Sequence, residues 1–231
     1  MTAAGIDHAP AAAPAAGRRA PAAGARLVWL FLASRRTPAA AWLLAGLGML
    51  MWASLHWHWN IAGGAAARQV IPLTIEAGSA AVIAVSTYGP FGEPERATGR
   101  WLPWLRMAAA LLLTGAAFGA LCAGATAGVL PGGSLALLRN VGGMTGTGLL
   151  AAAVLGGAFG WAGPIAYLLV TEVSLSGHPT TPWVWPARPP HDLGGALCAS
   201  AVFAAGVSAI MLLGARETGR DSPGPLSRWI S

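Results

Sequence analysis

Long apolar runs alternate with short polar or turn-forming segments along most of this chain. An α-helix rises about 1.5 Å per residue, so roughly 20 apolar residues, and about 17 at the lower end, cross the hydrocarbon core of a bilayer. Six segments approach or exceed that length, and we expect each to form a transmembrane helix: 39–57, 70–88, 107–127, 141–157, 160–175 and 193–214. The pattern therefore predicts an all-α integral membrane protein with six transmembrane helices.

The fourth and fifth predicted spans share one apolar stretch, 141–175. A single helix of that length would extend about 52 Å, which is too long for one crossing. Within it lies GGAFGWAGP at 156–164, which is dense in Gly and ends in Pro, a composition typical of a helix break. We therefore expect two shorter helices joined by a turn near 157–160.

The two ends of the chain differ from the apolar domain at 26–214. Residues 1–25 are rich in Ala, Pro and Gly, which is typical of a disordered tail. The run RLVWLFLASRR at 26–36 is too short to span, and its flanking arginines and Trp29 favour a helix in the headgroup layer. We therefore expect an N-terminal interfacial helix before the six spans, and a second polar tail at 215–231.

Positive charge is distributed unequally between the two sides of this topology. One side holds eleven arginines: Arg18, Arg19, Arg26, Arg35, Arg36, Arg96, Arg100, Arg106, Arg216, Arg220 and Arg228. The other side holds three: Arg68, Arg139 and Arg188. Because cytoplasmic loops carry the excess of Arg and Lys, both termini are expected in the cytoplasm of a multi-pass protein of the cell membrane.

Composition excludes several function classes. Only 10% of the residues are charged, against about 25% in soluble domains. All 14 of the Lys and Arg residues are Arg, so the chain can supply neither the lysine of a phosphate-binding P-loop nor a Schiff-base amine. No catalytic motif is visible, and the arginines form no clustered basic face of the kind that binds nucleic acid. We expect a non-enzymatic chain without a cofactor of its own and without a nucleic-acid partner.

Two carboxylates fall within the predicted spans. Glu76 lies six residues into the second span, about 9 Å below the outer surface by helical rise. Because charge inside a membrane is costly, Glu76 is a candidate for a substrate path or for pairing across helices. The alternative is a structural hydrogen bond, made by the protonated acid, to Ser or Thr on a neighbouring helix. Glu172, near the outer end of the fifth span, is a second candidate, although it can also reach the interface. Both lie on the outer half and could pair.

The predicted outer side also gathers histidines and tryptophans. Imidazoles are metal ligands, which makes four histidines candidate ligands: His56, His58, His178 and His191. The tryptophans among them are equally typical of anchoring at the membrane interface, so no metal site is predicted. The proline-rich loop at 176–195 is expected to be an ordered cap, which either shields a pathway or forms a rigid surface. The sequence GGMTGTG at 142–148 predicts close helix packing through small residues.

The predicted cytoplasmic loop at 88–106 mixes turn residues, both signs of charge and tryptophan. Glu93-Pro94-Glu95 is typical of a helix start, with Pro at the first position and acid in the first turn. The loop either lies on the membrane surface or docks a cytoplasmic partner. Its candidate docking residues are Glu93, Glu95, Arg96, Arg100, Trp101 and Trp104.

In layout the chain resembles the permease subunit of type-2 ABC exporters, and GEPERATGRWLPWLR at 92–106 looks like ABC permease-like membrane proteins of actinobacteria. The resemblance implies a coupling helix within 92–106, an interfacial helix at 26–36, a separate ATPase chain that binds ATP and Mg, and a second permease copy or homologue. It implies export of a hydrophobic, amphipathic or peptide-like substrate. The alternative is a non-transporting membrane scaffold or sensor.

Overall fold

A computed structural model describes residues 37–57, 64–87, 102–126, 128–130, 132–175 and 181–214. Within these ranges the chain is helical and contains no strand. The long helices are α2 (Thr37–His56), α3 (Gly64–Ser86), α5 (Leu102–Ala125), α6 (Gly133–Leu155), α7 (Ala162–Leu175) and α8 (Leu193–Leu213), and two 3-10 turns are η2 (Gly157–Phe159) and η3 (Trp185–Ala187). The expected tails at 1–25 and 215–231, the interfacial helix at 26–36 and most of the loop at 88–106 lie outside the described residues.

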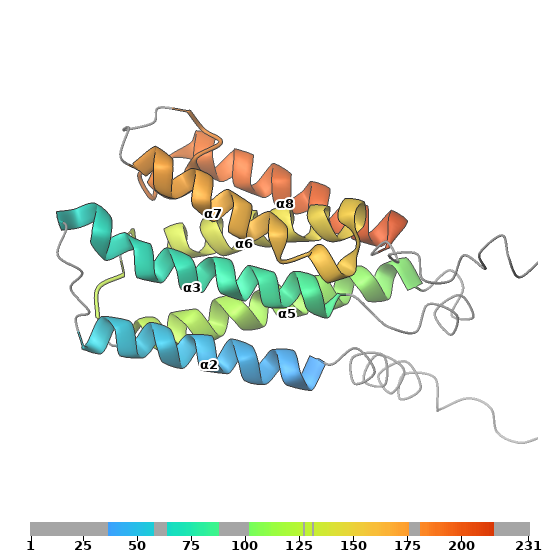
Figure 1. Cartoon of the computed structure of the whole chain (residues 1–231), viewed down its shortest axis with the longest axis horizontal. Helices are drawn as coiled ribbons and strands as arrows, with labels where there is room; N and C mark the ends of the chain where they lie inside the picture. The colour runs from blue at the N-terminus through green and yellow to red at the C-terminus, as the bar shows by residue number, and fades with distance from the viewer. Residues whose placement is uncertain are drawn as a thin grey trace, which may run out of the picture.

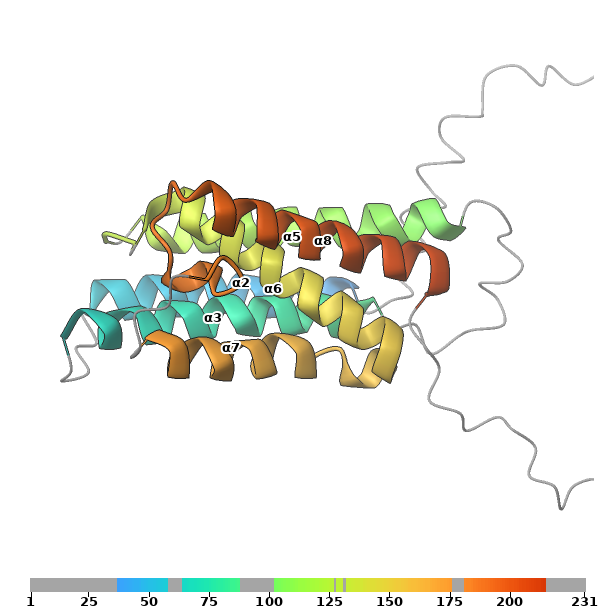
Figure 2. The ribbon, with the colours of Figure 1, turned by 90° about the horizontal axis from the view of Figure 1, so that it is seen from above.

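The six long helices run side by side in alternating directions (Figure 1). Residues 37 and 214 consequently lie at the same end of the bundle, which we call the terminal end. Residues 181–192 lie at the opposite end, which we call the cap end (Figures 1 and 2).

The expected break between the fourth and fifth apolar segments is confirmed. Helix α6 ends at Leu155, η2 follows, and α7 begins at Ala162. The chain turns at Gly156, whose φ of 106° lies in a region that favours glycine because a side chain there would be strained. Two helices start well before the predicted spans: α3 begins at Gly64, and α6 begins at Gly133, which places Arg139 within a helix instead of a loop.

Four of these helices are long and apolar enough to cross a membrane: α2, α3, α5 and α8. The chain is thus compatible with a multi-pass membrane protein. Helix α6 has 23 residues but contains Arg139, Asn140 and several glycines, which lower its hydropathy. Helix α7 has 14 residues and extends about 21 Å, which is short of the roughly 30 Å hydrocarbon core.

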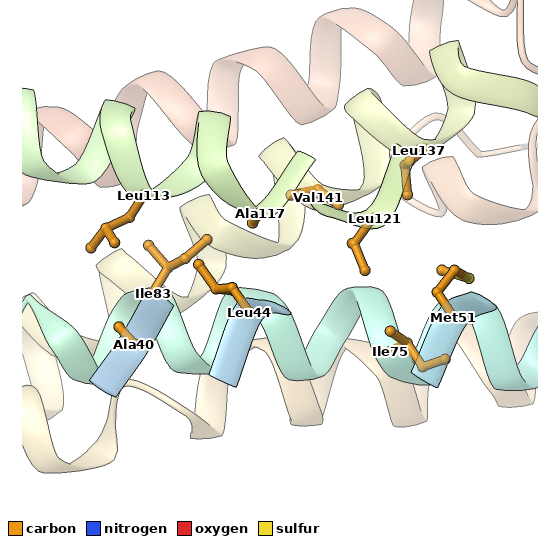
Figure 3. Packing of buried hydrophobic residues seen from close by; sticks show 10 residues of the cluster. All are labelled: Ala40, Leu44, Met51, Ile75, Ile83, Leu113, Ala117, Leu121, Leu137 and Val141. Carbon is orange, nitrogen blue, oxygen red and sulfur yellow. The ribbon is translucent and has the colours of Figure 1, made fainter. Parts of the chain in front are cut away.

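The main apolar core lies between α2, α3, α5 and α6 (Figure 3). Its buried side chains are Ala40, Leu44, Met51, Ile75, Ile83, Leu113, Ala117, Leu121, Leu137 and Val141. A second cluster joins α5 and α6 to α8 through Ala110, Leu149, Ala152, Ala153, Val207 and Ile210. Because α6 contributes to both clusters, it connects the two halves of the bundle.

Helix α6 makes its closest approaches through glycine. A Cβ on Gly146 would lie 2.6 Å from the backbone Cα of Phe203, and Gly206 of α8 faces Gly146 in return. Gly143 and Gly148 are similarly crowded, whereas Gly142 has open space. Small residues let helix backbones pack closely in a membrane, so the close packing expected from 142–148 is confirmed.

The outward faces of the bundle are apolar. Trp42 and Leu43 of α2 are 79% and 57% exposed, and Leu197 and Leu212 of α8 are 70% and 76% exposed. Soluble monomers rarely expose large continuous apolar surface, because burying such side chains away from water is favourable. A surface of this kind is suited to contact with lipid.

Candidate functional site

Residues 181–192 form an ordered cap that inserts a tryptophan into the bundle. Trp185 is 2% exposed, and its ring stacks on Tyr167 of α7 with a centroid distance of 4.3 Å and an interplanar angle of 18°. The Tyr167 hydroxyl donates a hydrogen bond of 2.7 Å to the carbonyl of Trp183. The indole also lies against Gly143, where a Cβ would be 2.6 Å from Cε2. Glycine at this position of α6 therefore makes room for the ring.

Two polar side chains of the helices hold the backbone of the cap. The Arg139 guanidinium donates to the carbonyl oxygens of Pro189, at 2.8 Å, and Arg188, at 3.0 Å. Gln69 of α3 donates through Nε2 to the carbonyl of Pro186 at 3.0 Å. The sequence interpretation placed Arg139 among the outer loop charges and missed this role, although a lone arginine followed by a long apolar run was a signal for it.

Asp192 starts α8 and closes the cap. Its carboxylate accepts from the backbone N–H of Gly195 at 2.6 Å, as an N-cap does, and pairs with Arg188 at 2.8 Å. The hydrogen bond from Arg188, together with that from Gly195, holds the pKa of Asp192 below its usual range. The Asp192 carboxylate in turn raises the pKa of Arg188.

A groove of about 440 Å³ lies between α5, α6 and α8, next to the cap. Its lining residues are Thr114, Leu135, Leu138, Arg139, Gly142, Gly143, Pro190, His191, Asp192, Leu193, Ala196, Ala199, Ser200 and Phe203. From Asp192 to Phe203, α8 rises about 16 Å along it. The charged and imidazole groups sit at the cap end, and small or apolar side chains line most of the remainder. Such a gradient suits an amphipathic molecule.

Glu76 does not line the groove. It lies near the middle of α3, is 4% exposed, and is hydrogen-bonded by the side chain of Asn140 on α6. The charge of Arg139 also acts on it. The sequence identified Glu76 but not Asn140, because the partner depends on which faces of the two helices meet. Its place on a substrate path stays a prediction.

Glu172 is half-buried on α7, and its Oε1 has no hydrogen-bond partner in the part of the chain that is described. The structure pairs Glu76 with Asn140 and not with Glu172. A role for Glu172 on a substrate path also stays a prediction.

The two histidines that the structure describes, His56 and His191, belong to different parts of the bundle. His56 ends α2 and stacks on Trp52 at 4.7 Å, which is an aromatic arrangement, while His191 lines the groove. His58 and His178 lie outside the described residues. Within those residues, no three His, Cys, Asp or Glu side chains gather into a group that could hold a metal ion.

Of the candidate docking residues, the structure describes Trp104, which is 55% exposed in the first turn of α5 at the terminal end. The others, Glu93, Glu95, Arg96, Arg100 and Trp101, lie outside the described residues, so a docking function for them stays a prediction.

The features located in the described residues are thus a cap held by Arg139 and Gln69, an amphipathic groove and a buried Glu76–Asn140 pair. Comparison with protein-family models, with curated proteins and with solved structures gives no match to this chain.

Proposed function

We propose that this chain is the permease subunit of an ABC exporter, which moves a hydrophobic, amphipathic or peptide-like substrate across the cell membrane. The observation that carries the proposal is the groove between α5, α6 and α8, with Arg139, His191 and Asp192 at one end and an apolar wall beyond. A substrate with a polar head and an apolar body would match that order. The energy would come from a separate ATPase chain, because this chain has no lysine for a P-loop.

The proposal includes six membrane crossings with both termini in the cytoplasm and an interfacial helix at 26–36. Helices α6 and α7 pack along α3, and α6 also packs along α8. Since α3 and α8 are apolar enough to span, α6 and α7 would lie in the same slab of membrane. The polar residues of α6 would be tolerated there because neighbouring helices cover them, as with other polar groups in membrane interiors.

In this proposal the ATPase binds at 92–106, and a second permease copy completes the transporter. The test places a photo-crosslinking amino acid at Trp104 in the full chain, in membranes that also contain the ATPase encoded by a neighbouring gene. Trp161 is the matched control, since it is also exposed and directly precedes α7, which begins at the terminal end. We expect a crosslink from position 104 to a chain with Walker motifs, and none from position 161. No ATPase crosslink from position 104 would contradict the coupling.

The substrate path is tested by filling the groove. Ser200→Trp places a large side chain at a groove-lining position of α8, and the adjacent Ala201→Trp places it at an exposed position that does not line the groove. Export measured in proteoliposomes with the ATPase should fall with Ser200→Trp and persist with Ala201→Trp. Equal export by both variants would remove the groove from the path.

A non-transporting scaffold or sensor remains the second candidate, and the clasped cap is the observation that favours it, since Trp185 closes the cap end. Glu76→Ala and Arg100→Glu separate the two functions in a transport or drug-resistance assay. Reduced export with an intact complex supports the permease. Unchanged export with lost complex assembly supports the scaffold.

A further inference from the structure

Glu76 and Asn140 face each other across the interface of α3 and α6. Each residue is 4% exposed, and the Asn140 side chain is hydrogen-bonded to the Glu76 carboxyl. Two oxygens of this pair, Oε2 of Glu76 and Oδ1 of Asn140, are buried and have no hydrogen-bond partner among the residues described. Asn140 can donate to the carboxyl of Glu76 only through Nδ2, because its Oδ1 only accepts.

The same chemistry explains why Oε2 of Glu76 and Oδ1 of Asn140 both lack a hydrogen-bond partner. An ionised carboxylate only accepts hydrogen bonds, and the oxygen of an amide also only accepts. With an ionised Glu76, Oε2 and Oδ1 would remain two buried acceptors without donors, which is costly in an apolar interior. One proton on Oε2 changes it into a donor, and Oδ1 is the acceptor that lacks one. A single proton would thus satisfy both atoms.

Oε2 of Glu76 accepts no hydrogen bond from a charged group in the part of the chain that the structure describes. Arg139 is the charged group that acts on Glu76 from the described elements packed against α3. Its Nη1 and Nη2 donate to the carbonyl oxygens of Pro189 and Arg188, and its Nε is buried and has no partner within the described ranges. The hydrogen bonds of the Arg139 guanidinium thus go to the cap, and Asn140 is the hydrogen-bond partner of Glu76.

We propose that Glu76 and Asn140 form a proton-binding site inside the bundle. Glu76 holds one proton on Oε2 and donates it to Oδ1 of Asn140, while Nδ2 of Asn140 donates to Oε1, so that two hydrogen bonds close a ring between α3 and α6. The bound species is a proton taken from solvent, and binding it converts the carboxylate to the neutral acid. The site stands apart from the groove and does not depend on the permease proposal.

Infrared spectroscopy of the full chain in lipid vesicles at neutral pH tests the proposal directly. A protonated carboxylic acid has a C=O stretching band that an ionised carboxylate lacks. We expect this band in the wild type, its loss in Glu76→Gln, and its persistence in the control Glu172→Gln. In Asn140→Leu the band should move to higher frequency, because the acid loses its acceptor. Absence of the band in the wild type, or its persistence in Glu76→Gln, would overturn the proposal.

Thermal unfolding of the same vesicle samples gives an independent readout. Gln at position 76 reproduces the hydrogen bonds of the protonated acid, with its NH₂ donating to Asn140 Oδ1, so Glu76→Gln should keep the wild-type Tm. Glu76→Leu removes the ring and should lower Tm. If a sodium ion bridged the two oxygens instead, replacing sodium by choline would lower the Tm of the wild type but not that of Glu76→Gln. That result would contradict proton binding.

Discussion

Helices α6 and α2 are similar in length but lie in opposite surroundings. Helix α6 packs against α3, α5, α7 and α8, and it buries the polar side chains of Arg139, Asn140 and Thr145. Helix α2 lies at the side of the bundle, packs mainly against α3 and α5, and exposes Trp42. Hydropathy therefore identifies the helix that faces outward more readily than the helix at the centre. A central helix is shielded by its neighbours, so it can carry glycine and polar groups.

The contrast between the surroundings of α6 and those of α2 is sharpest at two tryptophans: Trp185 of η3 is buried against α6, and Trp42 belongs to α2. Trp185→Ala removes a ring that is buried against Gly143 and Tyr167, and we expect a loss of about 4 kcal/mol, typical of emptying a large aromatic site. Trp42→Ala removes a ring that is 79% exposed on α2 and should change stability little in lipid. Thermal or denaturant unfolding in the same membrane mimetic measures both. Equal losses would show that Trp185 is not the anchor of the cap.

The crossing of α6 and α8 is expected to be nearly as sensitive. Gly146→Val places a side chain where even a Cβ would be 2.6 Å from the Phe203 backbone, which cannot move as a flexible side chain does. Overpacking of this kind costs up to about 3 kcal/mol. Gly142→Val, four residues earlier on the same helix and in open space, is the control. Similar unfolding temperatures for the two variants would be inconsistent with this crossing.

A smaller effect is expected from replacing Arg139, whose guanidinium donates hydrogen bonds to the backbone of the cap. Arg139→Leu removes two hydrogen bonds from a charged donor and also the cost of burying that charge, which leaves a net loss of about 2 kcal/mol. Hydrogen exchange should accelerate in 181–192. Arg188→Leu retains the backbone carbonyl that Arg139 contacts and should leave the interior of the cap protected. Unchanged exchange in Arg139→Leu would show that the cap is held by other contacts.

The smallest effect concerns the pair Arg188–Asp192. Because the pKa of Asp192 is lowered in the folded chain, its contribution to stability is present above the ordinary carboxyl pKa near 4 and is lost as the pH falls through the lowered value. Asp192→Asn keeps a side-chain oxygen for the N-cap but removes the charge. Tm measured against pH should therefore differ between wild type and Asp192→Asn at neutral pH and converge in acid. A difference in Tm that stays constant with pH would show that the Arg188–Asp192 ion pair does not contribute to stability.

Part of this arrangement was predictable from sequence because it depends on local composition. The break near 157–160 follows from clustered Gly before Pro164, and the crowded crossing follows from the glycines of 142–148. Both signals lie within one segment and need no knowledge of the neighbouring helices.

The pairing of Glu76 with Asn140 and the clasp by Arg139 were not predictable in the same way. Each depends on how α3, α6 and the cap are rotated and shifted against one another, and hydropathy does not report rotation. Arg139 was further obscured because α6 starts at Gly133, eight residues before the predicted span. The first turns of α6 contain Arg139 and Asn140, so their hydropathy is low and does not predict that they belong to the helix.

Labelling with a lipid-soluble photoactivated carbene, followed by mass spectrometry, tests the central claim that the middle of α6 is enclosed by lipid-facing helices. The experiment uses the unmodified chain in lipid vesicles, with a water-soluble carbene in a parallel sample. We predict that the lipid-soluble reagent inserts on the outward faces of α2 and α8, including Trp42 and Leu197. Neither reagent should label Met144, Thr145 or Leu149 of α6, which are fully buried and do not line the groove. Labelling of these three residues equal to that of α2, or labelling of Trp42 and Leu197 by the water-soluble reagent alone, would contradict the account.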